Sequence, residues 1–142
     1  MPQYSKASND RLTTAHPDLI TLFNYVIKHY DNTIVCGHRG EKEQNEAYRK
    51  GYSKLKWPNG KHNKLPSEAI DSAPFEVNAI DWKVKQSAHY AGYVVGVANT
   101  LYDLGIITHR IRSGADWDQD YDIDDTTFWD AAHFEIIQNK EN

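Results

Sequence analysis

Apolar side chains recur at intervals of three and four residues in two segments, which is the spacing of one face of an α-helix. The first segment follows His16-Pro17-Asp18 and stops at Asp31-Asn32, with apolar positions at Leu19, Ile20, Leu22, Phe23, Val26 and Ile27. The second runs from Gln86 to Leu104, before Gly105, and glycine is common just past a helix end. The pattern therefore predicts two amphipathic helices, of which the second is the longer.

Shorter runs rich in apolar residues predict strands, at 33–36, 69–75, 106–111 and 134–137. A more polar helix is predicted over 41–50, closed by Gly51. Prolines, glycines and lysines favour a loop over 52–67, and a run of aspartates favours another over 116–125. Helices and strands interleave without a repeat or a linker, so we expect an α+β fold in which a small antiparallel sheet packs against helices.

Length and charge limit the organisation of the chain and its partners. The 142 residues fit one compact domain, residues 1–142, whose 39% apolar content suffices for a core. A net charge of -4 argues against nucleic acid as a partner, because binding to phosphates needs clustered lysine and arginine. Residues 1–10 are polar and no stretch of about 18 apolar residues occurs, so we expect synthesis in the cytoplasm without membrane insertion.

Three residues of the type that binds metals fall near the ends of predicted strands. They are His62 in the long loop, Asp71 in the second strand and His133 just before the last. Two imidazoles and one carboxylate suit Zn²⁺ and leave a fourth position open for water. Asp71 has apolar neighbours, and a carboxylate entering a core is costly unless it is paired or bound to metal. A buried ion pair or a cap remains an equal alternative for this aspartate.

Other reactive residue types receive roles by position. Asp130 precedes His133 by three residues, so its carboxylate can act as general base on water while the imidazole binds the metal. Cys36 is the one cysteine, and a thiol inside a β-branched run is more commonly a core residue than a nucleophile. Surface or structural roles are expected for the remaining histidines, His16, His29, His38, His89 and His109.

Four ordered blocks of this sequence resemble the VanY-like (LAS-type) zinc peptidases, most closely the phage L-alanyl-D-glutamate peptidase endolysins. The blocks are Gly60-Lys61-His62, Glu68 to Pro74, Arg112 to Trp117, and Asp130 to Glu135. The turn Gly37-His38-Arg39 and the helical Gln44 also resemble that family, so the likeness spans roughly residues 34–137. Two departures are a loop between His62 and Asp71 that is about two residues longer, and Asp130 where many relatives carry glutamate.

The resemblance implies an LAS-type fold, related to hedgehog and D-Ala-D-Ala peptidases, without a separate wall-binding module. It implies that His62, Asp71 and His133 bind zinc, that Asp130 is the catalytic carboxylate and that Arg39 stabilises the oxyanion. Gln44 would support the substrate side. The implied protein is a monomeric phage endolysin that hydrolyses the L-alanyl-D-glutamate bond of peptidoglycan. It would leave the host cytoplasm after membrane permeabilisation and act on the periplasmic wall.

Alternating aspartates in the acidic loop offer hard oxygen ligands that suit Ca²⁺. They are Asp116, Asp118, Asp120 and Asp122. Calcium regulation is known among similar endolysins, but the turn glycine and terminal glutamate of an EF-hand are absent, so a solvated acidic loop is favoured over a calcium site. Three tryptophans, Trp82, Trp117 and Trp129, suit either the core or a peptide groove.

Three other functions remain open at this point. The nearest is a D-alanyl-D-alanine carboxypeptidase or dipeptidase, since the same zinc core serves both bonds in the family. A cysteine-type wall peptidase would use Cys36 as nucleophile with a histidine. A zinc-stabilised wall-binding module would keep the fold without turnover.

Overall fold

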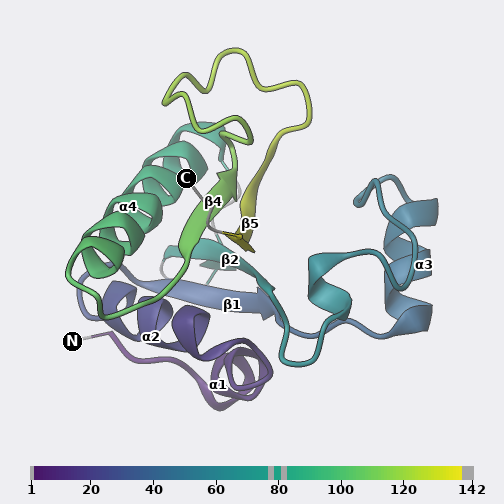
Figure 1. Cartoon of the computed structure of the whole chain (residues 1–142), viewed down its shortest axis with the longest axis horizontal. Helices are drawn as coiled ribbons and strands as arrows, with labels where there is room; N and C mark the ends of the chain where they lie inside the picture. Colours follow the sequence, from purple (N-terminus) through teal and green to yellow (C-terminus); the bar gives the residue numbers. More distant parts are fainter. Residues whose placement is uncertain (1, 77–78, 81–82, 139–142) are drawn as a thin grey trace.

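The computed structural model describes residues 2–76, 79–80 and 83–138, and its elements alternate along the chain (Figure 1). The helices are α1 (Lys6–Leu12), α2 (Pro17–Val26), α3 (Glu41–Arg49), α4 (Val84–Asp103) and the short 3₁₀ turn η1 (Lys61–Asn63). The strands are β1 (Asn32–Cys36), β2 (Ala69–Glu76), β3 (Ala79–Ile80), β4 (Arg110–Gly114) and β5 (Asp130–Ile137). The predicted α+β class is confirmed.

All the strand pairs among the described residues are antiparallel, in the order β1-β2-β5-β4, with β3 paired to β2. The register places Cys36 opposite Asp71, and Asp71 opposite His133. Residues directly opposite one another in a sheet point to the same face. Three neighbouring strands therefore project a thiol, a carboxylate and an imidazole from one side of the sheet.

The opposite face of the sheet carries the hydrophobic core. Ile70 and Phe134, each adjacent in sequence to a residue of the polar face, are fully buried. The Phe134 ring packs edge-on against Phe23 of α2 and Tyr90 of α4, at centroid distances of 5.7 and 5.9 Å. Figure 1 shows α4 lying beside the sheet with α2 below it. Because α2 and α4 cover one face, the polar face is left for the site.

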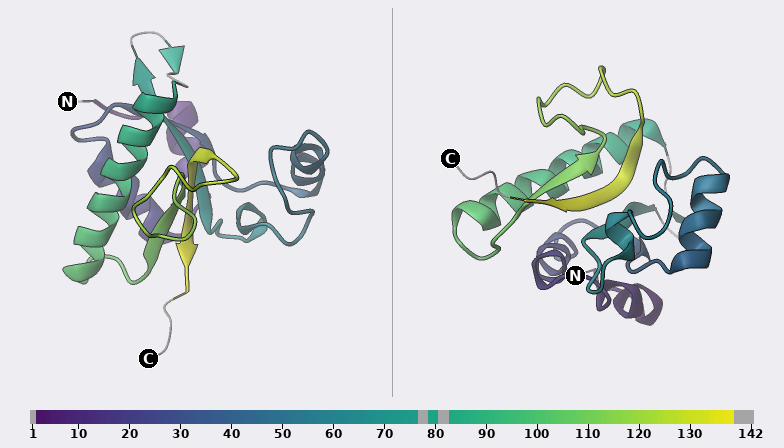
Figure 2. Two further views of the ribbon diagram at one scale, coloured as in Figure 1. Left: turned by 90° about the horizontal axis from the view of Figure 1, so that it is seen from above. Right: turned by 45° about the vertical axis from the view of Figure 1, so that its right-hand side comes forward.

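The segment from β1 to β2 leaves the helical core and forms a separate wall (Figure 2). It contains α3 and η1, and α3 stands away from α2 and α4 in both views. Helix α3 has a single fully buried side chain, Gln44. A helix with so little apolar contact is positioned by polar bonds rather than by a hydrophobic stripe.

Several predicted boundaries differ from the structure. The strand predicted over 106–111 is wrong in place, because β4 begins at Arg110 and residues 106–109 form a bend. Ile107 is buried there, so its hydrophobicity reflects core packing rather than a strand. The last strand begins at Asp130, four residues before the predicted start, and so carries Asp130 and His133 together.

Helix α1 was not predicted from the apolar pattern. Its buried residues are Ser8 and Leu12, too few to give a periodic signal, and it begins with a cap in which Ser8 N donates to Ser5 Oγ at 3.1 Å. The short strand β3 was also not predicted, and Trp82 lies outside the described residues. Among the described helices, none combines the length and apolar character needed to cross a bilayer.

Candidate active site

His62, Asp71 and His133 converge on one carboxylate oxygen, and we call these three residues the sheet cluster. Asp71 Oδ1 lies 3.1 Å from His62 Nε2 and 3.2 Å from His133 Nδ1. The two imidazole rings stand edge to face at a centroid distance of 5.1 Å. His62 lies 9 positions from Asp71 in the chain and His133 lies 62 positions from it, yet η1 and β5 bring both imidazoles to the same oxygen.

Each imidazole of the sheet cluster has its other nitrogen held by an acceptor. His62 Nδ1 lies 2.7 Å from the carbonyl oxygen of Gly37, and His133 Nε2 lies 2.8 Å from Glu135 Oε1. Both acceptors require the proton of a neutral ring to sit on that outer nitrogen, which directs the inner lone pair at Asp71. Only a proton or a cation can then join two inner nitrogens to a carboxylate oxygen. The donor set therefore fits a divalent metal.

The electrostatics of the cluster favour positive charge beside Asp71. Burial alone would lower the pKa of His62, but the charge and hydrogen bond of Asp71 outweigh it and raise the pKa to about 10. Burial is likewise overcome at His133, where the hydrogen bonds that the ring donates to Asp71 and Glu135 raise the pKa to about 9. Burial would raise the pKa of Asp71, yet the His62 charge and the bonds to both imidazoles hold it well below its usual range.

Arg39 reaches the same carboxylate from the turn after β1. Its Nη2 donates to Asp71 Oδ2 at 3.2 Å, and its Nη1 donates to Gln44 Oε1 at 3.1 Å. Gln44 is 1% exposed, and its Nε2 donates to Ser53 Oγ at 3.0 Å. The structure thus brings both predicted residues, Arg39 and Gln44, to the site, with Gln44 holding the guanidinium in place.

Asn63 completes this polar wall and was missed by the sequence analysis. Its Nδ2 donates to Gln44 Oε1 and to the carbonyl oxygen of Arg39, both at 3.0 Å. Its Oδ1 accepts from Gly60 N at 2.8 Å, which closes the η1 turn that carries His62. The residue adjoins the predicted ligand, but an asparagine in a polar loop carries no signal that separates a buried role from a solvated one.

Asp130 stands at the beginning of β5, partly buried, three residues from His133. Burial and then the negative charge of Asp71 raise its pKa, and the charges of His133, His62 and Arg39 oppose that shift. Those charges place Asp130 within electrostatic range of the sheet cluster. A carboxyl whose pKa is raised in such a site is suited to exchanging a proton.

Glu135 and Trp117 shape the other side of His133, and neither received a role from the sequence. Glu135 is 6% exposed and lies two residues after His133 on the same face of β5. The Trp117 ring lies 5.4 Å from the His133 ring, and its Nε1 donates to the Phe128 carbonyl oxygen at 2.6 Å. Strand alternation after His133 is the signal that would have pointed to Glu135.

Cys36 lies at the edge of the sheet cluster rather than deep in the core. One ligand atom each from Cys36, His62 and Asp71 lies within 4.8 Å of the others. The thiol is partly buried, and its Sγ donates weakly to the Gly37 carbonyl oxygen at 3.5 Å. The expectation of a plain core cysteine is therefore incomplete, because register with Asp71 turns this thiol toward the site.

The acidic loop gathers three of its four predicted carboxylates. Ligand atoms of Asp116, Asp118 and Asp120 lie within 4.8 Å of one another. Asp122 is not in that group, and its Oδ1 instead accepts from the backbone N of Asp124 at 3.0 Å. The loop therefore presents carboxylate oxygens that lie close together, and some of its carboxylates already accept hydrogen bonds from the backbone of the same loop.

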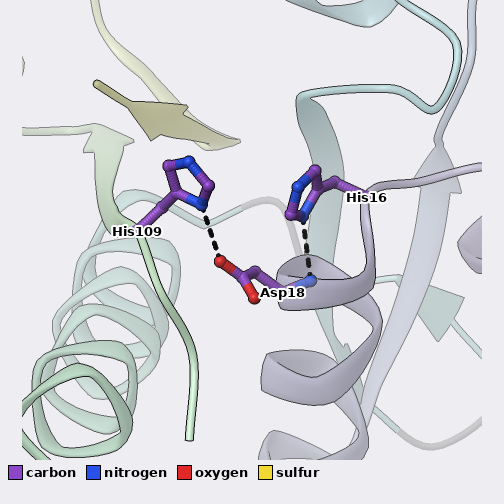
Figure 3. Close-up of side chains that lie close together, drawn as sticks. All are labelled: His16, Asp18 and His109. Carbon is purple, nitrogen blue, oxygen red and sulfur yellow. Dashed lines mark hydrogen bonds and ion pairs between the residues drawn. The ribbon is translucent and has the colours of Figure 1, made fainter. Parts of the chain in front are cut away.

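A second set of two imidazoles and a carboxylate lies at the start of α2, and we call it the α2 cluster (Figure 3). It consists of His16, Asp18 and His109. His16 Nδ1 accepts from Asp18 N at 3.0 Å, which caps the helix, and His109 Nδ1 lies 2.8 Å from Asp18 Oδ2. Thr108 donates to the same oxygen from both N and Oγ1, at 3.0 Å each. The two histidines thus have structural hydrogen bonds.

The polar face of the sheet thus carries two histidines and a carboxylate that meet at one oxygen. The profile of the phage L-alanyl-D-glutamate peptidase family matches residues 2–137, so the chain belongs to this family and is a peptidoglycan-cleaving phage endolysin. No curated protein sequence matches the chain.

A solved structure supports the fold assignment. The L-Ala D-Glu endopeptidase ChiX of Serratia marcescens superposes with a TM-score of 0.72 and 20% identity. The match covers 95% of this chain and 90% of that one. At this identity the likeness establishes the fold, and the family match carries the function.

Proposed function

We propose that this endolysin is a zinc peptidase that hydrolyses the L-alanyl-D-glutamate bond of peptidoglycan stem peptides, with His62, Asp71 and His133 as the metal ligands. The observation that carries the proposal is the approach of two imidazole nitrogens to Asp71 Oδ1, at 3.1 and 3.2 Å. The outer nitrogens are held by Gly37 and Glu135, as expected of ligating histidines.

The residues around the cluster suit amide hydrolysis. Bound zinc would polarise the scissile carbonyl and acidify water. Asp130 would take the proton from the attacking water and deliver it to the leaving amine, for which its raised pKa is suited. Arg39, held by Gln44 at 3.1 Å, would offset the negative charge that develops on the carbonyl oxygen.

Digestion of purified sacculi with and without a chelator tests both halves of this proposal. We expect new D-glutamate N-termini with the zinc-loaded protein, none after chelation, and recovery when zinc is returned. Release of D-alanine instead would favour the carboxypeptidase or dipeptidase alternative. Digestion that survives chelation but stops with iodoacetamide would favour Cys36 as nucleophile.

The binding-module alternative is tested at Asp130. We expect Asp130→Ala to keep zinc bound and the fold intact while digestion stops, because the variant removes the proton acceptor and leaves the ligands. Asp10→Ala is a matched control, since Asp10 is an exposed aspartate paired with Lys6 on α1. Equal digestion by wild type and Asp130→Ala would contradict the assigned role.

We further propose that the acidic loop binds Ca²⁺ through Asp116, Asp118 and Asp120, with Asp122 alongside. Hard carboxylate oxygens within 4.8 Å of one another support this. Calorimetric titration with Ca²⁺ should show heat in the wild type that is lost in Asp118→Asn, and absence of heat in the wild type would remove the proposal.

We also propose that the enzyme acts as a monomer and reaches the periplasmic wall from the host cytoplasm after membrane permeabilisation.

A further inference from the structure

We infer that Glu135 is a positioning residue that sets the orientation of the His133 ring for metal binding. The inference rests on the proposed role of His133 as a ligand and adds a determinant of metal affinity outside the ligand set. Glu135 would not touch the metal or the substrate. It would act through the imidazole beside it.

The contact between the two side chains is short and buried. His133 Nε2 lies 2.8 Å from Glu135 Oε1, and the Glu135 side chain is 8% exposed. The two residues are neighbours on one face of β5 because alternate residues of a strand point the same way. A carboxylate can only accept a hydrogen bond, so Nε2 must donate. The lone pair of Nδ1 is then directed toward Asp71 Oδ1, 3.2 Å away.

The other oxygen of Glu135 is occupied by cations. Arg112 Nε and Nη2 donate to Glu135 Oε2 at 3.1 and 3.0 Å, and Lys61 Nζ lies 3.4 Å from the same oxygen. Arg112 lies opposite Glu135 in the pairing of β4 with β5. Because Oε2 is held by two cationic side chains, Oε1 is left to face the imidazole. This fixes the carboxylate as well as the ring.

Trp117 restrains the ring from another side. Its ring lies 5.4 Å from that of His133, and its carbonyl oxygen accepts from Arg112 Nη1 at 3.2 Å. Arg112 therefore links the residue that bonds to His133 and the residue that packs on it. An imidazole held by a hydrogen bond at one nitrogen and by an aromatic ring beside it has little freedom to turn away from Asp71.

The alternative is that Glu135 serves only as the ion-pair partner that ties β5 to β4. Arg112→Gln distinguishes the two roles because it removes the bidentate pair and leaves the carboxylate facing His133. Glu135→Leu removes both interactions. Glu135→Gln retains a carbonyl oxygen that can accept from Nε2, so it is the conservative variant and the one more compatible with folding.

The test measures zinc affinity of the chelator-stripped full chain by competition with a chromogenic chelator, alongside the melting temperature of the metal-free protein. We expect Glu135→Leu to weaken zinc binding by about 10- to 100-fold, which is the typical effect when a ligating histidine loses the hydrogen-bond partner of its outer nitrogen. Glu135→Gln should lose less. Arg112→Gln should lower the melting temperature but weaken zinc binding much less than Glu135→Leu, because Lys61 still lies beside Oε2 and Oε1 can still accept from His133.

Two results would overturn the inference alone. Glu135→Leu and Glu135→Gln could both bind zinc as tightly as the wild type, or Arg112→Gln could lose as much affinity as Glu135→Leu. A different result reaches further: if His133→Ala binds zinc as tightly as the wild type, His133 is not a ligand and the proposed metal site fails with it.

Discussion

The sheet cluster and the α2 cluster contain the same residue types, two histidines and one aspartate, yet the histidine nitrogens bond to different partners in the two clusters. In the sheet cluster, His62 Nδ1 and His133 Nε2 bond outward, to Gly37 and Glu135, and the inner nitrogens meet at Asp71. Residue types alone would rank the two sets equally. The outer partners, rather than the histidines and aspartates, separate a site for a cation from a set of side chains that satisfy one another.

In the α2 cluster one histidine bonds to a backbone amide instead of the carboxylate, and the carboxylate oxygen that the other approaches is shared with Thr108. His16 Nδ1 accepts from Asp18 N at the helix cap, and His109 Nδ1 bonds to Asp18 Oδ2, which also accepts twice from Thr108. A metal ion there would have to displace several of these bonds. We therefore expect the α2 cluster to join the start of α2 to the segment before β4.

The largest expected effect comes from removing the central charge of the sheet cluster. Asp71→Asn should reduce sacculus digestion by more than about 1,000-fold, the scale of losing an essential catalytic group. A neutral amide cannot balance a cation between two imidazoles, so bound zinc should fall too. Asp18→Asn is the matched change in the α2 cluster and should retain digestion. Loss of turnover in both, with both folded, would break the comparison.

Removing the cation that faces Asp71 should have the next largest effect. Arg39→Ala should lower kcat by about 10²- to 10³-fold, as expected for one donor that stabilises an oxyanion. Zinc should stay bound, since the guanidinium bonds to Asp71 Oδ2 and the imidazoles approach Oδ1. Steady-state digestion of a soluble stem peptide measures kcat and KM separately. A change confined to KM would indicate substrate binding instead.

Stability, not catalysis, should respond at Asp18. Asp18→Ala should cost about 1–3 kcal/mol of unfolding free energy, because Thr108 N and the imidazole of His109 lose their acceptor. Burial would raise the pKa of Asp18, but hydrogen bonds from His109 and Thr108 lower it. A carboxyl whose pKa is lowered in the folded state stabilises that state at pH values above the unfolded-state pKa of about 3.9. This stabilisation is lost as the pH falls through the folded-state pKa.

Urea denaturation at several pH values measures this contribution. The difference between wild type and Asp18→Ala should be full near neutral pH and should shrink below about pH 4, where the unfolded carboxyl takes up its proton. A difference that grows on acidification would have the wrong sign for a lowered pKa and would contradict this account.

The smallest expected effect is a null result that sharpens the contrast. Calorimetric titration of the metal-free chain should give the same zinc binding for His109→Gln as for the wild type. His29→Gln is the matched control, because His29 is exposed and lies in neither cluster. A drop in bound zinc in His109→Gln alone would show that the α2 cluster is a metal site after all.

Local pattern was sufficient for the longest elements and insufficient where packing decided. The prediction for 86–104 matches α4, Val84–Asp103, because Tyr90, Val94, Ala98 and Leu101 form a continuous buried stripe at helical spacing. The strand predicted over 106–111 was misplaced because Ile107 is buried from a bend. Asn63 was missed because its hydrogen bonds lie in a loop whose conformation no periodicity describes.

The amino-acid sequence by itself determined the α+β class, the family resemblance and which residues of the site have reactive side chains, since periodicity and residue chemistry are local properties. The tertiary structure decided the rest. Strand register placed Asp71 between Cys36 and His133, and outer acceptors chose which nitrogen of each histidine faces inward. Orientation depends on partners distant in the chain, so two sets of histidine and aspartate that look alike in sequence acquire different roles only when folded.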